Sequence, residues 1–510
     1  DTPAQGEPLD APGPVRPFVH VQPGAGPRAR ITLRRRPRNL AALVQTDEDG
    51  IATRTPVGRL PAEPRPHARV RWATWHTGRP GVARLGLALD GAGERAASVL
   101  RQIGDGHAAA GTDAVELEVA FSDYPERVAL ALPAPVVGYR APDGETPGGP
   151  SMPLDVVIGE DELPPLLGRL AALPGVSARR VGHSFEGRPI DAVEVVAPPG
   201  AAVWSGVKAS LYKPTLLAVG RHHANEVAST PAALRLAELL ATDPAYRPLL
   251  DRVNVALLPL ENADGAALHY AMQREHPTWK LHAARYNAVG LEFAREFFAP
   301  DTPYGEARPR PLLWRRWRPD VVADNHGVPS HEWNQLFSGF NSPPRFGVSY
   351  WLVQALIYGI LRYPPDEPAY RAFGEALRDR VSAAIAADPE ILAANRVLRE
   401  RYTTWGHAWL PDNFPAGFYA EMQWYFGPRP EGWRRSRQPA NYERVTTANW
   451  VTEVPDETAQ GAYLALVARA HLIANLATLR LLAELAPPVE RRVAAGPAGV
   501  QVTLRRRRPL

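Results

Sequence analysis

The chain of 510 residues contains no cysteine. Disulfide bonds and thiolate metal ligands are therefore excluded, and any metal site must use His, Asp and Glu. No apolar run reaches the roughly 18 residues that a membrane-spanning helix needs, so we predict no membrane span. The net charge of +4 is small for this length and gives little support to nucleic-acid binding. Two short basic runs, residues 34–36 and 505–508, are more simply interpreted as a solvated strand and a solvated tail.

Proline is abundant, with 54 residues, and the length favours more than one domain. Residues 1–30 show no periodicity and predict an extended lead-in. Residues 31–150, which end in a Pro/Gly linker, predict a small antiparallel β-rich N-terminal domain, because apolar and polar side chains alternate in several short segments. The clearest of these segments are residues 70–74, 115–119 and 127–132.

After residue 150 the pattern changes to strands that alternate with helices. Apolar runs of strand length lie at residues 190–196, 215–219, 253–258 and 321–323. Helical patterns cover residues 162–173, 369–387 and 463–485, and another helix is expected to start with Thr230 as its cap and Pro231 in its first turn. This alternation predicts an α/β domain over residues 151–487, with a mixed, mostly parallel twisted sheet flanked by helices. Residues 488–510 are expected to form a basic tail.

The strongest chemical signal directly follows the buried strand expected at residues 215–219. His223 and Glu226 are three positions apart there, and open α/β sheets bind ligands at the carboxyl ends of their strands. Zinc accepts imidazole nitrogen and carboxylate oxygen, so this pair is a candidate metal site. A second pair with the same spacing, His183 and Glu186, lies in a Gly-rich turn that no buried strand precedes, and we interpret it as structural.

A third ligand must come from another segment. His326 follows the short strand at residues 321–323 and precedes a glycine, so it can face a site with little crowding from the backbone. His331 and Glu332 lie just downstream and are rival ligands.

A hydrolytic zinc site also needs a general base that does not bind the metal. Glu453 lies at the end of the apolar strand expected at residues 448–454 and could take a proton from water. Glu457, four residues further on, is the alternative.

Taken together, these residues resemble the zinc carboxypeptidase family, whose fold is a mixed sheet flanked by helices, over roughly residues 155–485. Six elements match in order. They are the turn Gly182 to Ile190 (GxSxEGRxI in the family), the ligand pair His223 and Glu226, the turn Asn262 to Gly265 (NPDG), the segment Gly290 to Phe297 (GVDLNRNF), His326 and Glu453.

The resemblance implies hydrolysis of peptide bonds, most simply the removal of C-terminal residues, by water activated on one zinc ion per chain. The implied roles are zinc binding by His223, Glu226 and His326, general base catalysis by Glu453, orientation of His223 by Glu292, binding of the substrate carboxylate by Arg295, and oxyanion stabilisation by Lys280 or Arg285.

Some positions depart from the family pattern. Ala294 stands where the family has an asparagine beside Arg295, and Lys280 stands in place of the oxyanion arginine. The substrate-binding tyrosine has four candidates, which are Tyr402, Tyr419, Tyr425 and Tyr442. These departures keep two alternatives open: a zinc amidase or deacylase that acts on cell-wall peptides or modified amino acids, and a non-catalytic binding relative.

The expected partner is a peptide or small amide substrate, without nucleic acid, and the sequence does not indicate an oligomeric state. The chain begins with Asp1 rather than Met. We therefore consider a removed leader, with a secreted or periplasmic protein as the outcome, while the cytoplasm stays open.

Overall fold

The computed structural model describes most of the chain after residue 150 and mainly strands before it. The described ranges are residues 17–23, 29–35, 42–46, 52–56, 69–79, 82–90, 100, 114–132, 151–197, 206–277, 281–330, 333–334, 350–351, 353–408, 417–430, 437–487, 489–496 and 499–508.

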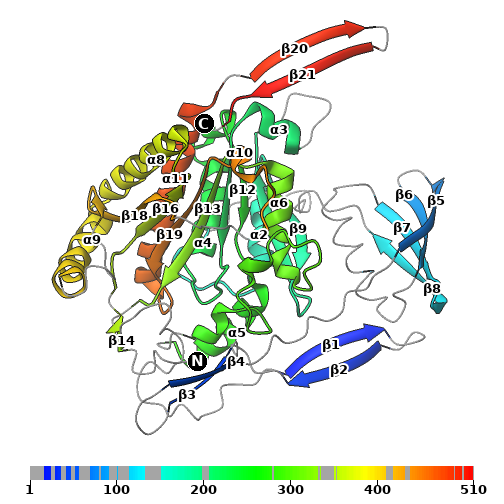
Figure 1. Ribbon diagram of the computed structural model, residues 1–510, viewed down its shortest axis with the longest axis horizontal. Helices are drawn as coiled ribbons and strands as arrows, with labels where there is room; N and C mark the ends of the chain where they lie inside the picture. Colours follow the sequence, from blue (N-terminus) through cyan, green and yellow to red (C-terminus); the bar gives the residue numbers. More distant parts are fainter. Residues whose placement is uncertain are drawn as a thin grey trace.

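Nine strands in the described residues form one central sheet. They are β9 (Val176–His183), β10 (Pro189–Val195), β11 (Thr215–Gly220), β12 (Asn254–Leu258), β13 (Val321–Val328), β16 (Tyr358–Tyr363), β17 (Phe418–Tyr419), β18 (Met422–Pro428) and β19 (Ala448–Pro455). Their order across the sheet is β17-β18-β16-β19-β13-β11-β12-β10-β9 (Figure 1). The centre, β12-β11-β13-β19, is parallel, whereas β10 and β16 pair antiparallel with its two edges. The predicted mixed α/β sheet is confirmed.

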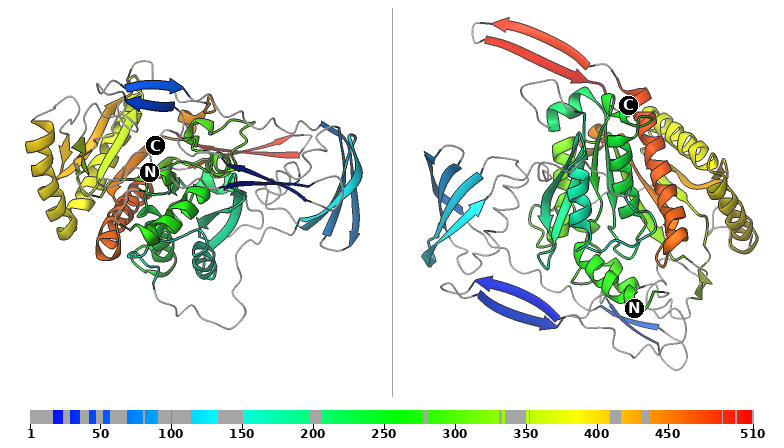
Figure 2. Two further views of the ribbon diagram at one scale, coloured as in Figure 1. Left: turned by 90° about the horizontal axis from the view of Figure 1, so that it is seen from below. Right: turned by 180° about the vertical axis from the view of Figure 1, so that it is seen from behind.

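Helices cover both faces of this sheet. Four helices lie side by side on one face, in the order α2 (Leu163–Ala171), α4 (Ser229–Thr242), α11 (Gly461–Leu485) and α8 (Pro368–Ala386). Helix α6 (Pro309–Trp317) packs on the other face (Figures 1 and 2). The chain moves one way across the sheet from β11 to β12 and the other way from β12 to β13. Because parallel crossovers are right-handed, the connecting helices α4 and α6 must lie on opposite faces.

The core is built from fully buried, mostly apolar strands and from apolar helix faces. Every residue of β11 and of β12 is buried, as expected for central strands covered on both faces. Among the described residues, α11 alone is long and apolar enough to cross a membrane, but 72% of its most apolar window is buried inside the fold. It packs against α4, α8 and β19, so the structure uses its apolar surface for the core.

The N-terminal region contains a four-stranded sheet, β5 (Arg69–Arg79), β6 (Val82–Asp90), β7 (Ala114–Phe121) and β8 (Tyr124–Leu132), in that order. The predicted strands are present, but the prediction of a purely antiparallel sheet is wrong, since β6 and β7 pair in parallel. Their connection of more than 20 residues is long enough for a parallel crossover. Two separate hairpins precede this sheet: β1 (Pro17–Pro23) with β2 (Ala29–Arg35), and β3 (Ala42–Thr46) with β4 (Ala52–Pro56). The hairpin β1–β2 begins inside the expected lead-in, and the domain boundaries stay a prediction.

Two boundaries predicted from the sequence are wrong. Helix α4 begins at Ser229, and Thr230 is not its cap, because the Thr230 hydroxyl donates to the carbonyl of Pro259 at 2.7 Å. Strand β13 continues to Val328, so His326 lies within the strand and not in a loop after it.

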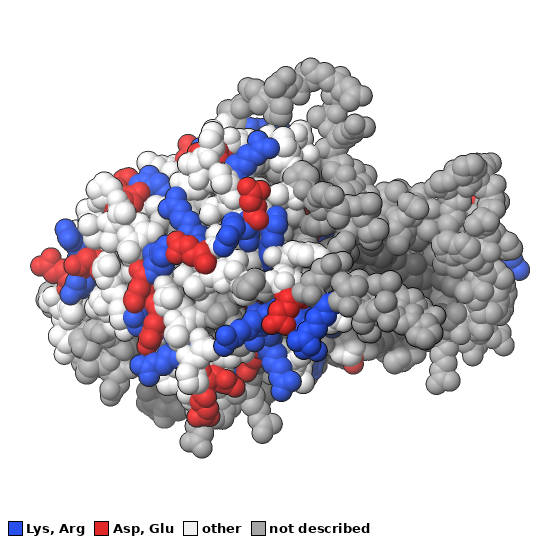
Figure 3. All heavy atoms as spheres, turned by 90° about the horizontal axis from the view of Figure 1, so that it is seen from above, with Lys and Arg blue, Asp and Glu red and all other residues white. Residues whose placement is uncertain are grey.

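The basic tail is also structured. β20 (Val489–Gly496) and β21 (Gly499–Arg506) form a hairpin that projects from the body (Figure 1). Arg506 donates to the buried carboxylate of Asp320 at 2.9 Å, and Arg508 contacts the same carboxylate. The interpretation of residues 505–508 as solvated is therefore wrong for Arg506 and Arg508. On the face shown in Figure 3, basic and acidic side chains are interspersed over the described residues.

Candidate metal centre

A buried turn after β11 shapes the first half of the site. Arg221 has a left-handed backbone (φ 55°) although it is not glycine, and its side chain is fully buried. Its guanidinium donates to the carbonyls of Ala224 and Ile158 at 2.7 and 3.1 Å. Such a backbone conformation is unfavourable for a bulky residue and persists where surrounding contacts enforce it. These contacts fold the turn so that His223 and Glu226 face each other.

The three predicted ligands converge. The carboxylate oxygens of Glu226 lie 2.7 Å from Nδ1 of His223 and 2.9 Å from Nδ1 of His326, and the two Nδ1 atoms are 3.0 Å apart. Ligand atoms around a tetrahedral zinc lie roughly 3.3–3.5 Å from one another, so a slight expansion of this triangle fits the ion. Two imidazole nitrogens and one carboxylate oxygen are also a donor set that catalytic zinc sites use. The residues present therefore fit the metal.

Both histidines are oriented from behind by carboxylates. Nε2 of His223 lies 2.8 Å from Glu292, and Nε2 of His326 lies 3.2 Å from Asp324. A carboxylate on Nε2 keeps the proton there and leaves the Nδ1 lone pair for a metal. The structure thus places Glu292 where it can orient His223. The sequence analysis gave Asp324 no role, although residues two apart on a strand share a face.

The charges around Glu226 hold it ionised. Burial raises the pKa of this carboxyl, but His223 and His326 outweigh burial and bring the pKa well below its ordinary value. Arg285 and the backbone N–H of Gly327 each donate to the carboxylate at 2.9 Å. For His326, burial lowers the pKa, but Asp324 and Glu226 raise it well above the ordinary value when no cation is bound. A divalent cation would replace that proton and satisfy the same carboxylates.

His222 is a further buried histidine at this site, and the sequence analysis did not single it out. Its Nε2 lies 2.6 Å from Glu292 and its Nδ1 lies 2.9 Å from Glu261. Burial lowers the pKa of His222, but the two carboxylates outweigh it and raise the pKa to about 9. Nothing in the local sequence indicated this, because both partners come from other segments.

Residues 170–339 match the family model described as zinc carboxypeptidase. This part of the chain is thus similar to zinc carboxypeptidases. Carboxypeptidase Z of Mus musculus is 30% identical over 122 residues, which is 23% of this chain and 17% of the mouse protein. Carboxypeptidase Z of Homo sapiens is 28% identical over 158 residues, 30% of this chain and 22% of the human protein. The chain thus aligns with only a small share of either relative.

Solved structures to which the chain is similar include carboxypeptidase A from Helicoverpa armigera, with a TM-score of 0.42 and 14% identity, covering 79% of this chain and 84% of that one. A metallo-carboxypeptidase from Burkholderia cenocepacia has a TM-score of 0.39 and 19% identity, covering 63% of this chain and 69% of the other.

Glu453 lies beyond the residues that match the zinc carboxypeptidase family model, but it is next to the metal centre. In the parallel pair of β13 and β19 it stands directly opposite His326, and directly opposite residues in a sheet point to the same face. Glu453 is half-buried, whereas the alternative base Glu457 is 2% exposed. The half-buried carboxylate is the better placed of the two to meet a substrate.

The remaining predicted residues differ in their distance from the centre. Arg285 contacts Glu226 directly, as described above. Arg295 is exposed on the short helix η4 (Phe293–Glu296), which begins after Glu292. Lys280 and the rival ligands His331 and Glu332 lie outside the described residues.

The second His–Glu pair belongs to a turn that packs against the segment resembling the family's NPDG turn. Asp264 in that segment accepts hydrogen bonds from the hydroxyl of Ser184 at 2.5 Å, the backbone of Glu186 at 2.9 Å and the guanidinium of Arg188 at 2.7 Å. His183 instead lies 3.5 Å from Arg180. These contacts agree with a structural role for the pair.

Of the four candidate tyrosines, Tyr425 is the one that the structure brings near Glu453, whose charge contributes to raising the pKa of Tyr425 after burial. Its hydroxyl donates to Gln354 at 2.6 Å. Tyr442 stacks on Trp314 in the core, Tyr402 is fully buried, and Arg378 covers the ring of Tyr419.

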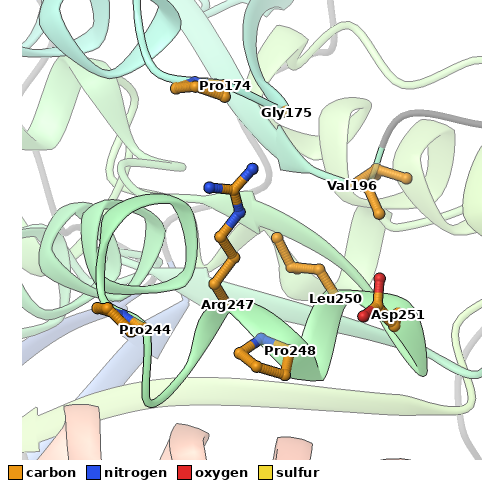
Figure 4. A pocket seen from close by; sticks show the side chains of 9 residues that line it. Pro174, Gly175, Val196, Pro244, Arg247, Pro248, Leu250 and Asp251 are labelled. Carbon is orange, nitrogen blue, oxygen red and sulfur yellow. The ribbon is translucent and has the colours of Figure 1, made fainter.

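A surface groove of about 320 Å³ lies away from this centre (Figure 4). Its lining includes Gly175, Val196 and Leu250, which border the start of β9, the end of β10 and the start of β12. That edge of the sheet is opposite to the carboxyl ends of β11 and β13, so the groove is not part of the metal centre.

Proposed function

We propose that the chain is a zinc-dependent peptidase that removes C-terminal residues from peptides. The observation that carries this proposal is the convergence of His223, Glu226 and His326, with a carboxylate behind each imidazole and Glu453 on the neighbouring strand. The match of residues 170–339 to the zinc carboxypeptidase family model supports the same chemistry.

In this proposal His223, Glu226 and His326 hold one zinc ion per chain. When bound, zinc supplies a Lewis acid that makes water acidic enough to attack near neutral pH. The two imidazoles keep their Nδ1 lone pairs directed inward, because Glu292 and Asp324 hold the protons on Nε2. Glu226 stays ionised through the contacts with Arg285 and the backbone of Gly327.

Glu453 then acts as the general base. Its carboxylate accepts a proton from the attacking water and returns one to the leaving amine, a role that typically contributes a factor of about 10²–10⁴ to the rate. Arg285, which is buried beside Glu226, supplies positive charge for the oxygen that becomes negative, and Lys280 stays the alternative. Arg295, exposed beside the centre, would bind the free carboxylate of the substrate.

The test uses Glu453→Gln and a peptide with a free C-terminus. We expect the variant to retain one zinc per chain and to lose kcat by about 100-fold or more, since the amide cannot accept the proton. Glu457→Gln, prepared in parallel, should keep most of the turnover. Normal turnover in Glu453→Gln with loss in Glu457→Gln would assign the base to Glu457 instead.

A zinc amidase on the same fold is the second candidate, favoured by Ala294 next to the exposed Arg295. An exopeptidase depends on the free carboxylate, so amidating the C-terminus should reduce kcat/KM by at least about tenfold. Equal cleavage of free and amidated peptides would favour the amidase and contradict the removal of C-terminal residues.

A further inference from the structure

The polar contacts around the metal centre close into a ring, here called the carboxylate ring. Its members, in order, are His223, Glu292, His222, Glu261, Arg310, Asp324, His326 and Glu226, and Glu226 returns to His223. Three of them are the predicted metal ligands. The other five come from the turn after β11, the end of β12, the start of η4, helix α6 and strand β13.

One side of the ring runs through His222. Glu292 uses one oxygen for His223 at 2.8 Å and the other for His222 at 2.6 Å, so each carboxylate oxygen faces an imidazole. The second nitrogen of His222 contacts Glu261 at 2.9 Å. His222 is 4% exposed and Glu261 is fully buried. The imidazole that precedes His223 in the sequence thus fixes the position of the carboxylate behind His223.

The other side runs through Arg310 on α6. Its guanidinium donates from Nε and Nη2 to the two oxygens of Glu261 at 3.0 and 2.6 Å, and also to Asp324 at 3.0 Å. Asp324 in turn contacts Nε2 of His326. A planar guanidinium can bind two carboxylates at a fixed angle, which the ammonium group of lysine cannot do. Arg310 therefore ties the carboxylate behind His326 to the one that holds His222.

A second metal site is the competing explanation, since nitrogen and oxygen atoms of His222, His223 and Glu292 lie within 4.8 Å of one another. Charge argues against it. The four carboxylates of the carboxylate ring, those of Glu226, Glu261, Glu292 and Asp324, face Arg285, Arg310 and one divalent cation, so the charges within the ring balance before His222 is counted. The contacts also argue against it, because both oxygens of Glu292 and both nitrogens of His222 already have partners.

We propose that His222 and Arg310 are positioning residues, which join the carboxylates behind the two metal-binding histidines into one rigid frame through Glu261. The inference rests on the proposed metal site. A frame that fixes both imidazoles before the metal arrives lowers the cost of ordering them, so it increases metal affinity without touching the ion. Because the frame is closed, a substitution of one of its residues should weaken metal binding by both imidazoles.

The test measures zinc affinity by competition with a chelator for the wild type, His222→Gln, Arg310→Lys and the double variant. Each single variant should bind zinc about 10–100-fold more weakly, a range typical for residues behind metal ligands. The double variant should bind little more weakly than the weaker single variant, because the two residues act through one frame. With Co²⁺ in place of zinc, the visible spectrum of each single variant should differ from that of the wild type.

Arg316→Lys is the matched control. Arg316 lies on the same helix and donates from Nε and Nη2 to Glu194 at 2.7 and 3.3 Å, outside the carboxylate ring. This substitution should leave zinc affinity within about twofold and the cobalt spectrum unchanged. Thermal melts of the metal-free proteins show whether each variant folds. If one single variant does not fold, the zinc affinity of the other is enough for the test.

The outcomes separate the two proposals. If the wild type binds one zinc and hydrolyses peptides, but both single variants bind zinc within about threefold of the wild type, the positioning roles are overturned and the function stands. If the fold-losses of zinc affinity in the two single variants multiply in the double variant, the proposal of a closed frame is overturned. Two cations per chain in the wild type would make His222 a ligand and overturn its positioning role. A wild type that binds no zinc would overturn both proposals.

Discussion

At the scale of single residues, the metal centre depends on atoms that face it and on a glycine that makes room for them. Gly327 donates its backbone N–H to Glu226, and a Cβ added at this position would lie 1.8 Å from a carboxylate oxygen of Asp456. The other oxygen of Asp456 accepts from the backbone of Ala228 at 2.6 Å. Burial, and after it the charge of Glu226, raises the pKa of Asp456 well above its ordinary value, and the side chain is fully buried.

Gly327→Ala should therefore destabilise the protein by about 1–3 kcal/mol and weaken zinc binding, because the methyl group displaces either Asp456 or the strand that carries His326. Gly168→Ala is the control, since Gly168 lies within helix α2 with nothing within 4 Å of an added Cβ. That change should stabilise the protein by about 0.5–1 kcal/mol. Equal effects of the two substitutions on unfolding and zinc affinity would contradict the role of Gly327.

The sequence could predict that His223, Glu226 and His326 lie together, because each follows or lies in an apolar strand, and strand ends of one sheet meet at one edge. It could not identify His222, Glu261 or Arg310. Their contacts join positions far apart in the chain, such as Glu261 and Arg310, which are 49 positions apart, and leave no local pattern.

At the scale of elements, the predicted strands and long helices of the central domain are largely confirmed, because burial on both faces makes strands apolar throughout. The elements that were missed include strands β9, β16 and β18 and helices α5 (Ala263–Glu275), α6 and α9 (Pro389–Arg401). Residues 355–361 form a continuous apolar run that could have indicated β16, in which three of the six residues are buried. The C-terminal hairpin was missed because its arginines suggested solvation rather than an ion pair.

The anchor of that hairpin is Asp320, which is fully buried between β11, β13 and the hairpin. It accepts from the backbone of Thr215 at 2.9 Å and from Arg506 at 2.9 Å, and the side chain of Arg506 is 1% exposed. Asp320→Asn should destabilise the protein by about 3–5 kcal/mol, because it leaves a buried cation without its counter-charge. Arg505→Gln, at an exposed neighbouring position, should change stability by less than about 0.5 kcal/mol.

Chemical denaturation measures both variants. Asp320 lies at the edge of the sheet opposite to the metal centre, so the folded fraction of Asp320→Asn should keep its zinc affinity. If Asp320→Asn has the same free energy of unfolding as Arg505→Gln, the ion pair between Asp320 and Arg506 contributes little to stability.

At the scale of the whole molecule, one sheet brings distant parts of the chain to a common edge. The turn after β11 supplies His223 and Glu226, β13 supplies His326, and β19 supplies Glu453 from more than 120 residues further along. Helices cover both faces of the sheet, and the side chains of His223, Glu226 and His326 are buried at this edge. Charges that are shielded from water interact more strongly than charges in water. The loops between the strands can vary in sequence and length without displacing these side chains, because the parallel strands at the centre of the sheet hold them in place.

The measurement that tests this account most directly is the zinc content of the purified wild type, His326→Ala and His183→Ala. His183 is the control, because it belongs to the other His–Glu pair and contacts Arg180 instead of the centre. We expect about one zinc per chain in the wild type and in His183→Ala, and less than about a tenth of that in His326→Ala. Full zinc content in His326→Ala, or its loss in His183→Ala, would contradict the assignment of the metal centre.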